Sequence, residues 1–184
     1  MSSVLEEFMS LLTGSFHNEN QYMALKAQGK DYVYAEHINT ICNDKIDGLA
    51  DDFAGVFLIE ESYYHLGGQT RAMHHLFLFT EEDGEVVLTS YALPEGYNQS
   101  TFTYANVDRL DYASLKVSER FVPARYRYHD GYWEGGSESM FSPRVRFILH
   151  ERFSKKGLEV LEQIETDGVR TFGYDEPIFY EKRA

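Results

Sequence analysis

The first thirty residues carry a helical pattern of apolar positions. Between residues 4 and 12, apolar side chains recur with the i, i+3, i+4, i+7 spacing of an amphipathic helix, which Ser2 or Ser3 is able to cap. A second helix is predicted roughly over 18–28, because Gly29 suits the left-handed conformation that ends many helices. The pattern therefore predicts two helices before any strand, and the first should rest its apolar face on the remainder of the protein.

From Tyr32 onward, short runs rich in Val, Ile, Phe, Tyr and Thr alternate with turn residues, which is typical of β-strands. The turn residues are of the kind found in tight hairpins, so sequential strands should be antiparallel neighbours. These turns are Gly67-Gly68, Asp83-Gly84, Asp130-Gly131, Lys156-Gly157 and Asp167-Gly168. The expected strands cover residues 31–41, 53–64, 70–80, 85–93, 97–104, 119–128, 132–137, 144–153, 158–166 and 169–181.

About ten short antiparallel strands would expose their edges as a flat sheet, and closure into a barrel, or a sandwich, removes those edges. We predict a mainly β protein, an antiparallel barrel with helices at its mouth or side. Residues 106–115 depart from the strand pattern and fit a short helix, capped by Asn106 or Asp108. No linker, repeat or low-complexity tract divides the chain, so residues 1–184 should form a single domain.

The net charge of the chain limits the classes of macromolecule and surface that it is expected to bind. With 17 Lys and Arg against 30 Asp and Glu, the formal net charge is 17 − 30 = −13, which repels phosphate backbones and anionic lipid surfaces. Nucleic acid and membranes are therefore not expected as partners. The longest apolar runs, such as 56–59, are far too short to span a bilayer, and acidic Glu6 and Glu7 stand where a secretion signal would be basic. We expect a soluble, cytoplasmic protein.

Common catalytic and metal-binding motifs are missing. The single cysteine, Cys42, excludes an internal disulfide, and we interpret it as a small half-buried strand residue because no basic neighbour lowers its pKa. His74 and His75 are adjacent on a strand and point to opposite faces, so we predict no metal site. The chain also has no Gly-x-Ser-x-Gly elbow and no glycine-rich phosphate loop.

Alternation along the strands groups the polar residues by face without telling which face is inside. Arg71 and His75 share one face of the 70–80 strand, whereas Glu60 and Glu61 lie on opposite faces of the 53–64 strand. Further on, arginines alternate with aromatic residues from residue 120 to 133. Such an arrangement holds a planar anion by guanidinium contacts and stacking, or consists of exterior residues paired with nearby carboxylates.

Several short strings follow one another in an order that covers nearly the whole chain. They are Gly14-Ser15-Phe16-His17-Asn18-Glu19-Asn20-Gln21, His37-Ile38, Leu58-Ile59-Glu60-Glu61-Ser62-Tyr63-Tyr64, Arg71, Ser90-Tyr91-Ala92-Leu93, residues 126–135, Phe172-Gly173, Pro177 and Phe179. In this order and spacing they resemble the T-type phycobiliprotein lyases, the CpcT/CpeT family. The resemblance implies a calycin-type (lipocalin-like) antiparallel barrel. It also implies that the protein binds a linear tetrapyrrole (bilin), phycoerythrobilin or phycocyanobilin, and transfers it to a cysteine of a phycobiliprotein β subunit.

The resemblance also implies roles for particular residues. Glu60 is the first choice for a carboxylate that favours protonation of the bilin, with Glu61 as the alternative on the other face. Arginines are expected to clamp the two propionates of the bilin: Arg71 and the group Arg125, Arg127, Arg144 and Arg146. Hydrogen-bonding or stacking groups of the pocket are expected to be Tyr64, Tyr91, His37 and His75. The nucleophilic thiol would belong to the acceptor protein, and no intrinsic cofactor is required.

Two other interpretations remain open. A non-catalytic calycin carrying a different apolar or aromatic ligand would suit Met73 and Phe172, which stand where the family has a second arginine and a tryptophan. An interaction module would instead fill the barrel with its own side chains. The many aromatic residues also leave open whether the chain forms a homodimer.

Overall fold

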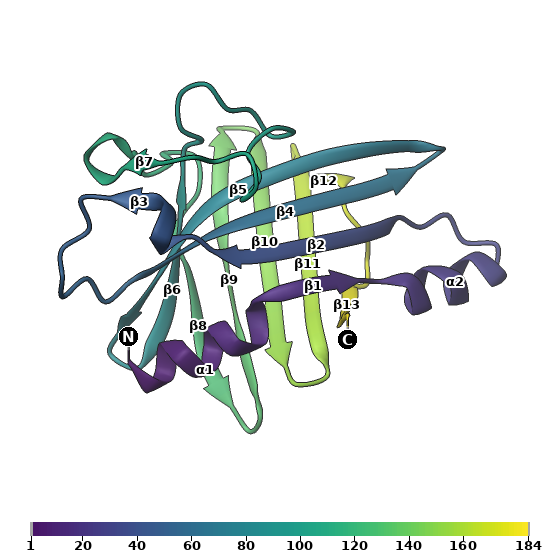
Figure 1. Ribbon diagram of the computed structural model, residues 1–184. Coiled ribbons are helices and arrows are strands. Elements are labelled where there is room, and N and C mark those ends of the chain that lie inside the picture. The colour runs from purple at the N-terminus through teal and green to yellow at the C-terminus, as the bar shows by residue number, and fades with distance from the viewer. Residues whose placement is uncertain (1, 184) are drawn as a thin grey trace.

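Ten antiparallel strands close into a barrel in the computed structural model, which describes residues 2–183. Around the barrel the strand order is β10-β9-β8-β6-β5-β4-β2-β1-β13-β11, and pairing of β11 with β10 completes the ring. In Figure 1, β2, β4 and β5 cross in front of β9, β10 and β11, with helix α1 below them. The predicted mainly β, calycin-like barrel with two N-terminal helices is thus confirmed.

The elements have the following bounds. The helices are α1 (Ser3–Leu12) and α2 (Glu19–Ala27), with short 3-10 turns η1 (Asn43–Lys45) and η2 (Tyr112–Ser114). The strands are β1 (Gly14–His17), β2 (Tyr34–Ile41), β3 (Ile46–Asp47), β4 (Val56–Leu66), β5 (Gln69–Glu82), β6 (Glu85–Tyr91), β7 (Leu110–Asp111), β8 (Ala124–His129), β9 (Tyr132–Ser142), β10 (Val145–Ser154), β11 (Gly157–Thr166), β12 (Val169–Phe172) and β13 (Ile178–Lys182).

Hairpin chemistry sets the register of the strands, as the sequence predicts. Asp83, Asp130 and Asp167 adopt left-handed conformations with φ of 53°, 38° and 54°, and a glycine with positive φ follows each one. Asp-Gly tolerates this geometry, and the resulting turn matches the twist of the two strands it joins. The β5–β6, β8–β9 and β11–β12 hairpins are therefore fixed locally, by a pair of residues each.

Helix α1 closes one end of the barrel. Ser2 caps it by accepting a hydrogen bond from the backbone N–H of Leu5 at 3.2 Å. Phe8 is fully buried and forms the centre of an aromatic cluster that fills this end. The rings around it, with centroids 5.2 to 5.6 Å away, are those of Phe79, Tyr126, Trp133 and Phe153. The amphipathic face expected for the first helix thus plugs the barrel.

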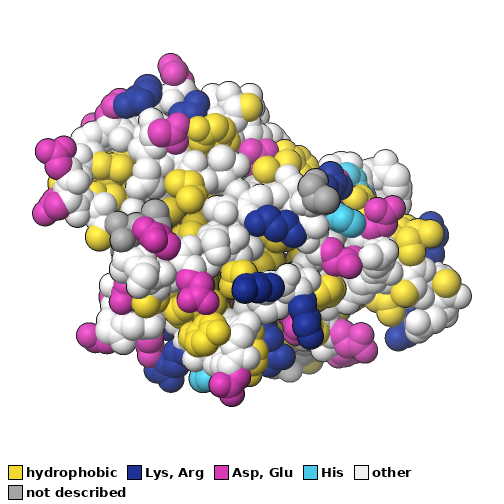
Figure 2. All heavy atoms as spheres, turned by 60° about the horizontal axis from the view of Figure 1, so that its bottom comes forward, with side chains coloured by type: hydrophobic (Ala, Val, Ile, Leu, Met, Phe, Trp, Pro, Cys, Tyr) yellow, Lys and Arg dark blue, Asp and Glu magenta, His cyan; other side chains and the backbone are white. Residues whose placement is uncertain are grey.

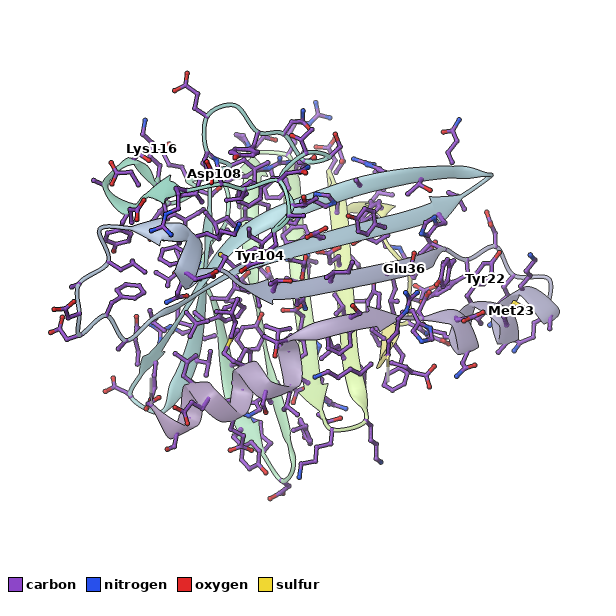
Figure 3. All side chains as sticks on the ribbon, in the orientation of Figure 1. Tyr22, Met23, Glu36, Tyr104, Asp108 and Lys116 are labelled. Atoms are coloured by element: carbon purple, nitrogen blue, oxygen red, sulfur yellow. The ribbon has the colours of Figure 1, made fainter. Side chains whose placement is uncertain are left out.

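Helix α2 lies apart from the core. It has no buried residue and projects beyond the barrel wall, where Figure 3 labels Tyr22 and Met23. The side chain of Met23 is 56% exposed, and the ring of Tyr22 lies 5.8 Å from that of Tyr34 on β2.

No helix within residues 2–183 combines the length and the apolar character needed to cross a membrane. On the face in Figure 2, acidic, basic and apolar side chains are interspersed.

A second core lies outside the barrel, between the β4–β5 hairpin and the segment over 92–118. Phe57 and Leu76 from the hairpin pack there with Phe102, Val107 and Leu110 from the segment. Two predictions for this segment are wrong: residues 97–104 form turns rather than a strand, and 106–115 form β7 and η2 rather than a helix.

In residues 92–118, side-chain oxygens accept hydrogen bonds from backbone N–H groups that would donate to backbone carbonyls in a regular strand or helix. Asn98 Oδ1 accepts from the backbone N–H of Ser100, and Thr103 Oγ1 accepts from that of Asn106. Asp111 accepts from the N–H of Ala113 and caps η2. Such local bonds compete with strand and helix formation, which explains why the apolar spacing misled the prediction here.

Two further differences concern strands. Strand β1 was not predicted from the sequence, and residues 169–181, predicted as one strand, contain two strands, β12 and β13. β1 is only four residues long, too short for a periodic pattern, yet it pairs with both β2 and β13. β12 and β13 are separated by 173–177, a stretch with Gly173 at φ 94° and with Pro177, which lacks an N–H donor. These two strands pair with different parts of β11.

Candidate functional site

The barrel encloses a cavity of about 750 Å³. Its walls are the inward faces of the strands, and apolar side chains from most of them line it, including Leu58, Phe77, Leu149 and Ile164. The lining residues that are exposed gather at 66–71, 99, 118–122 and 172–176, which we call the mouth. The volume is in the range of pockets that hold small organic ligands and cofactors.

The β4–β5 pair decides which predicted site residues face the cavity. Glu60 and Tyr64 on β4 point inward opposite His75 and Arg71 on β5, and all four line the cavity. Glu61 points outward, where it accepts from the backbone N–H of Tyr104 at 3.0 Å and lies outside the cavity lining. The structure therefore separates the two alternatives for the acidic residue and places Glu60 at the cavity.

Glu60 is an ionised carboxylate held beside an imidazole. Nδ1 of His37, on β2, lies 3.6 Å from Oε2 of Glu60, and Ser62 Oγ donates to Oε1 at 3.1 Å. Burial by itself raises the pKa of Glu60, but the nearby charges of His37 and His75 and these polar contacts outweigh it and lower the pKa to about 2. Nε2 of His37 is buried and has no hydrogen-bond partner within residues 2–183. Glu60 and His37 together provide an acceptor and an unused ring nitrogen beside the cavity.

Two further glutamates face the cavity that the sequence argument did not select. Glu151 on β10 accepts a hydrogen bond from the hydroxyl of Tyr126, and Glu162 on β11 lies in the wall near it. Burial is the main reason that the pKa of Glu151 rises to about 8 and that of Glu162 to about 7, and the charge of Glu60 adds to both. One sequence pattern could have identified these glutamates, because each shares a strand face with apolar residues. These are Phe147 and Phe153 for Glu151, and Val160 and Ile164 for Glu162.

The arginines divide into an outer and an inner group. Arg125, Arg127, Arg144 and Arg146, all predicted as ligand clamps, point outward and pair with carboxylates, so they contribute nothing to the cavity. They do so because the alternate positions on the same strands, Ala124 and Tyr126 on β8 and Phe147 and Leu149 on β10, point into the barrel. The partners of these four arginines are Glu82, Glu85, Glu138, Glu165 and Asp167.

Two arginines at the mouth stand out from the others. Within the described part of the chain, Arg71 and Arg120 are the arginines that form no ion pair with a carboxylate, and both line the cavity. The guanidinium of Arg120 stacks 3.8 Å from the ring centroid of Phe141. Phe141 in turn belongs to a cluster with Phe121 and Phe147, whose ring centroids lie 5.2 to 5.5 Å apart. The mouth thus presents free positive charge beside aromatic surface.

The remaining predicted residues have mixed positions. Tyr64 lines the cavity, and burial raises its pKa well above the ordinary value. Tyr91 borders the cavity but packs mainly into the outer core, with its ring 5.3 Å from that of Phe57. Cys42 is fully rather than half buried, and burial raises the pKa of its thiol to about 12. Residues 2–183 bring no three His, Cys, Asp or Glu side chains together as a metal site.

The fold and the cavity define a calycin-like barrel with an internal cavity, acidic groups in its wall and arginines without carboxylate partners at its mouth. No family model matches the chain, and no curated protein matches it. The resemblance to the T-type lyases therefore stays a prediction.

Proposed function

We propose that this protein binds a linear tetrapyrrole in its barrel and transfers it to a cysteine of a phycobiliprotein β subunit. The observation that supports this most is the division of charge along the cavity, with Glu60 inside and Arg71 and Arg120 at the mouth. A bilin has the complementary division: its pyrrole nitrogens, which carry N–H groups, lie along one edge of the molecule, and its two propionates extend from the other.

Each part of the bilin has a candidate partner. The pyrrole N–H groups donate to the ionised Glu60, whose low pKa keeps it an acceptor at neutral pH. The propionates reach Arg71 and Arg120, and such charge-assisted hydrogen bonds to carboxylates are among the strongest available. The flat conjugated rings lie against the aromatic cluster around Phe141. The interior volume also argues against the alternative in which the barrel is filled by its own side chains.

The acceptor protein supplies the nucleophile in this scheme. Cys42 is buried in the outer core and its thiol pKa is about 12, so it is neither accessible nor ionised. The thiolate of the acceptor cysteine adds to the ethylidene carbon of ring A. A carbon–sulfur bond forms, and the displaced electron pair takes up a proton on the ring system. The barrel's contribution is to hold the bilin in one conformation with its nitrogens against Glu60, which is a proximity effect.

The test is a titration of the purified protein with phycocyanobilin and phycoerythrobilin, followed by visible absorbance and fluorescence. We expect a saturable one-to-one change for the wild type and about ten- to hundredfold weaker binding for Arg71→Ala, since a charge-assisted hydrogen bond is worth about 1.5–3 kcal/mol. Arg144→Ala is the matched control, because Arg144 pairs with Asp167 outside the barrel and should bind like the wild type. No spectral change with either bilin contradicts the proposal.

An assay of bilin transfer to the acceptor protein distinguishes a lyase from a non-catalytic carrier. The loaded protein is mixed with a phycobiliprotein β subunit, and covalent attachment is read as zinc-enhanced fluorescence of the denatured subunit. Attachment above the level of free bilin supports the lyase. Binding without faster attachment supports the non-catalytic calycin.

A further inference from the structure

One part of the barrel wall is closed by side chains instead of strand pairing. On the edge of β11 that faces away from β10, β13 pairs with residues 158–160 and β12 with residues 164–166. Residues 173–177, which we call the strap, connect β12 to β13 and belong to no strand. The strap forms one side of the mouth, and three of its residues line the cavity: Gly173, Tyr174 and Glu176.

Two glutamine side chains hold the strap from opposite sides. Gln21 on α2 uses both polar atoms of its amide: Nε2 donates to the carbonyl oxygen of Pro177 at 3.0 Å, and Oε1 accepts from the N–H of Phe179 at 2.9 Å. Nε2 of Gln163 on β11 donates to the carbonyl oxygen of Tyr174 at 2.7 Å. The amide of Gln21 thus supplies a donor and an acceptor, as a residue of a neighbouring antiparallel strand would.

The start of α2 places Gln21 beside the strap. Asn18 precedes the helix and is fully buried, but its side chain does not cap α2. It bonds to the chain around β2 instead, where it donates to the carbonyl oxygen of Val33 at 2.9 Å and accepts from the N–H of Ala35 at 2.8 Å. Because α2 has no buried residue, it adds little to the core. Its contact with the strap through Gln21 is therefore the structural role that we assign to it.

We propose that the strap is a gate of the cavity and that Gln21 is the latch that keeps it closed. Besides the glutamine bonds, Tyr32 holds the strap: its ring centroid lies 4.3 Å from that of Tyr174, and its hydroxyl lies 3.5 Å from the carbonyl oxygen of Pro177. Segments held by so few contacts open locally while the remainder of the fold stays intact. Gly173, at φ 94°, gives the strap a flexible end, and the pairing of β13 with β1 and β11 anchors the other.

A gate and a binding contact have different kinetic signatures. When the closed state dominates, a ligand enters only after the strap opens, and it leaves by the same step. Loss of the latch populates the open state and raises both rates, so their ratio, the Kd, changes little. Loss of a contact with the ligand mainly raises the dissociation rate. The inference rests on the proposed function only for the identity of the ligand.

The experiment compares wild type, Gln21→Leu and Asn20→Leu. Leucine is similar in size to these side chains but has neither donor nor acceptor. Asn20 is the matched control, because its amide bonds to the exposed Glu181, beyond the strap, at a position that pairs with β1. Stopped-flow absorbance with phycocyanobilin gives both rates. We expect each to rise about tenfold in Gln21→Leu, which loses two neutral hydrogen bonds, and to stay unchanged in Asn20→Leu.

Hydrogen exchange without ligand tests the latch separately. The amides of Tyr174, Glu176 and Ile178 should exchange about tenfold faster in Gln21→Leu, while those of the β9–β10 pair keep their wild-type rates. Unchanged exchange over the strap overturns the latch. Faster exchange without faster association overturns the gate, and a rise in the dissociation rate alone makes Gln21 a ligand contact.

The remaining outcomes also decide. If the wild type does not bind phycocyanobilin, the proposed function fails, and the same two rates are measured with the apolar dye anilinonaphthalene sulfonate. A wild type that binds neither compound has no gated cavity, which overturns the inference as well. Should Gln21→Leu not fold, Gln163→Leu replaces it with the same expected rates, because it releases the strap from the side of β11.

Discussion

Glu60 and Glu61 are neighbours of identical chemistry, and they lie on opposite faces of the same strand. Glu61 is 8% exposed, and its two oxygens accept from the hydroxyl of Tyr63 at 2.8 Å and the N–H of Tyr104 at 3.0 Å. It thereby fastens the 92–118 segment, on which Figure 3 labels Tyr104, to the outside of the barrel. Glu60 forms no such hydrogen bond to the 92–118 segment, and its side chain borders the cavity.

The histidine pair on the facing strand repeats this contrast. His74 is 1% exposed within the outer packing, its ring 5.0 Å from that of Tyr63. His75 faces inward opposite Glu60 and stacks on Phe77 at 5.4 Å. Glu61 and His74 therefore take part in packing the 92–118 segment, although His74 also borders the cavity, whereas Glu60 and His75 point into the cavity. Residue type alone does not distinguish these roles, because the two faces carry the same residue types.

The largest expected difference between the faces is in packing. Phe57 is fully buried in the outer core, so Phe57→Ala should lower the free energy of unfolding by about 3–5 kcal/mol. Phe77→Ala should have less than half that effect, because Phe77 already borders the cavity. Urea unfolding of both variants measures this. Equal losses would show that the inner face is packed as tightly as the outer one.

The next effect is on the pH dependence of stability. The pKa of Glu162 is about 7 in the folded protein and near the ordinary 4.5 when unfolded, so its contribution to stability is full below about 4.5 and is lost as the pH rises through 7. Between pH 5 and 8, Glu162→Gln should lose less stability than the wild type, by on the order of 2 kcal/mol. Thermal unfolding across this range checks it, and Glu159→Gln should keep the wild-type slope.

The smallest effect concerns the two glutamates themselves. Glu61→Gln removes one of two acceptors for partly buried donors and should destabilise the protein by about 1 kcal/mol, with bilin affinity unchanged. Glu60→Gln should change the spectrum of the bound bilin. Denaturant unfolding and bilin titration of both variants give the comparison. Weaker bilin binding by Glu61→Gln alone would reverse the assignment of the two faces.

Much of the barrel could be predicted from the sequence because its signals are local. Each Asp-Gly turn fixes a hairpin, and alternation places Arg71 with His75 and separates Glu60 from Glu61. Which face of each strand points into the barrel could not be predicted, since this depends on how strands far apart in the sequence pair to close the barrel. Alternation puts Arg125 and Tyr126 on opposite faces, but nothing local shows that the tyrosine, rather than the arginine, points inward.

For the candidate site, the sequence argument selected residues from the resemblance to a family rather than from the strand pattern. The structure brings Glu60, His37 and His75 together at the cavity from β4, β2 and β5, and their role in binding stays a prediction. Glu151 and Glu162 were not selected because alternation alone does not tell which face of a strand points into the barrel. Only the closed barrel brings them to the same interior as Glu60.

Strand β1, only four residues long, has a kinetic consequence. It pairs with β2 on one side and with β13 on the other, so the contact Phe16–Lys182 joins the beginning of the barrel sequence to its end. Contacts between such distant parts of a chain form late and slow the folding of β proteins, because a long loop must first lose its freedom. We therefore expect the pairing of β1 with β13 to form late, and the ring of strands that surrounds the cavity stays open until it does.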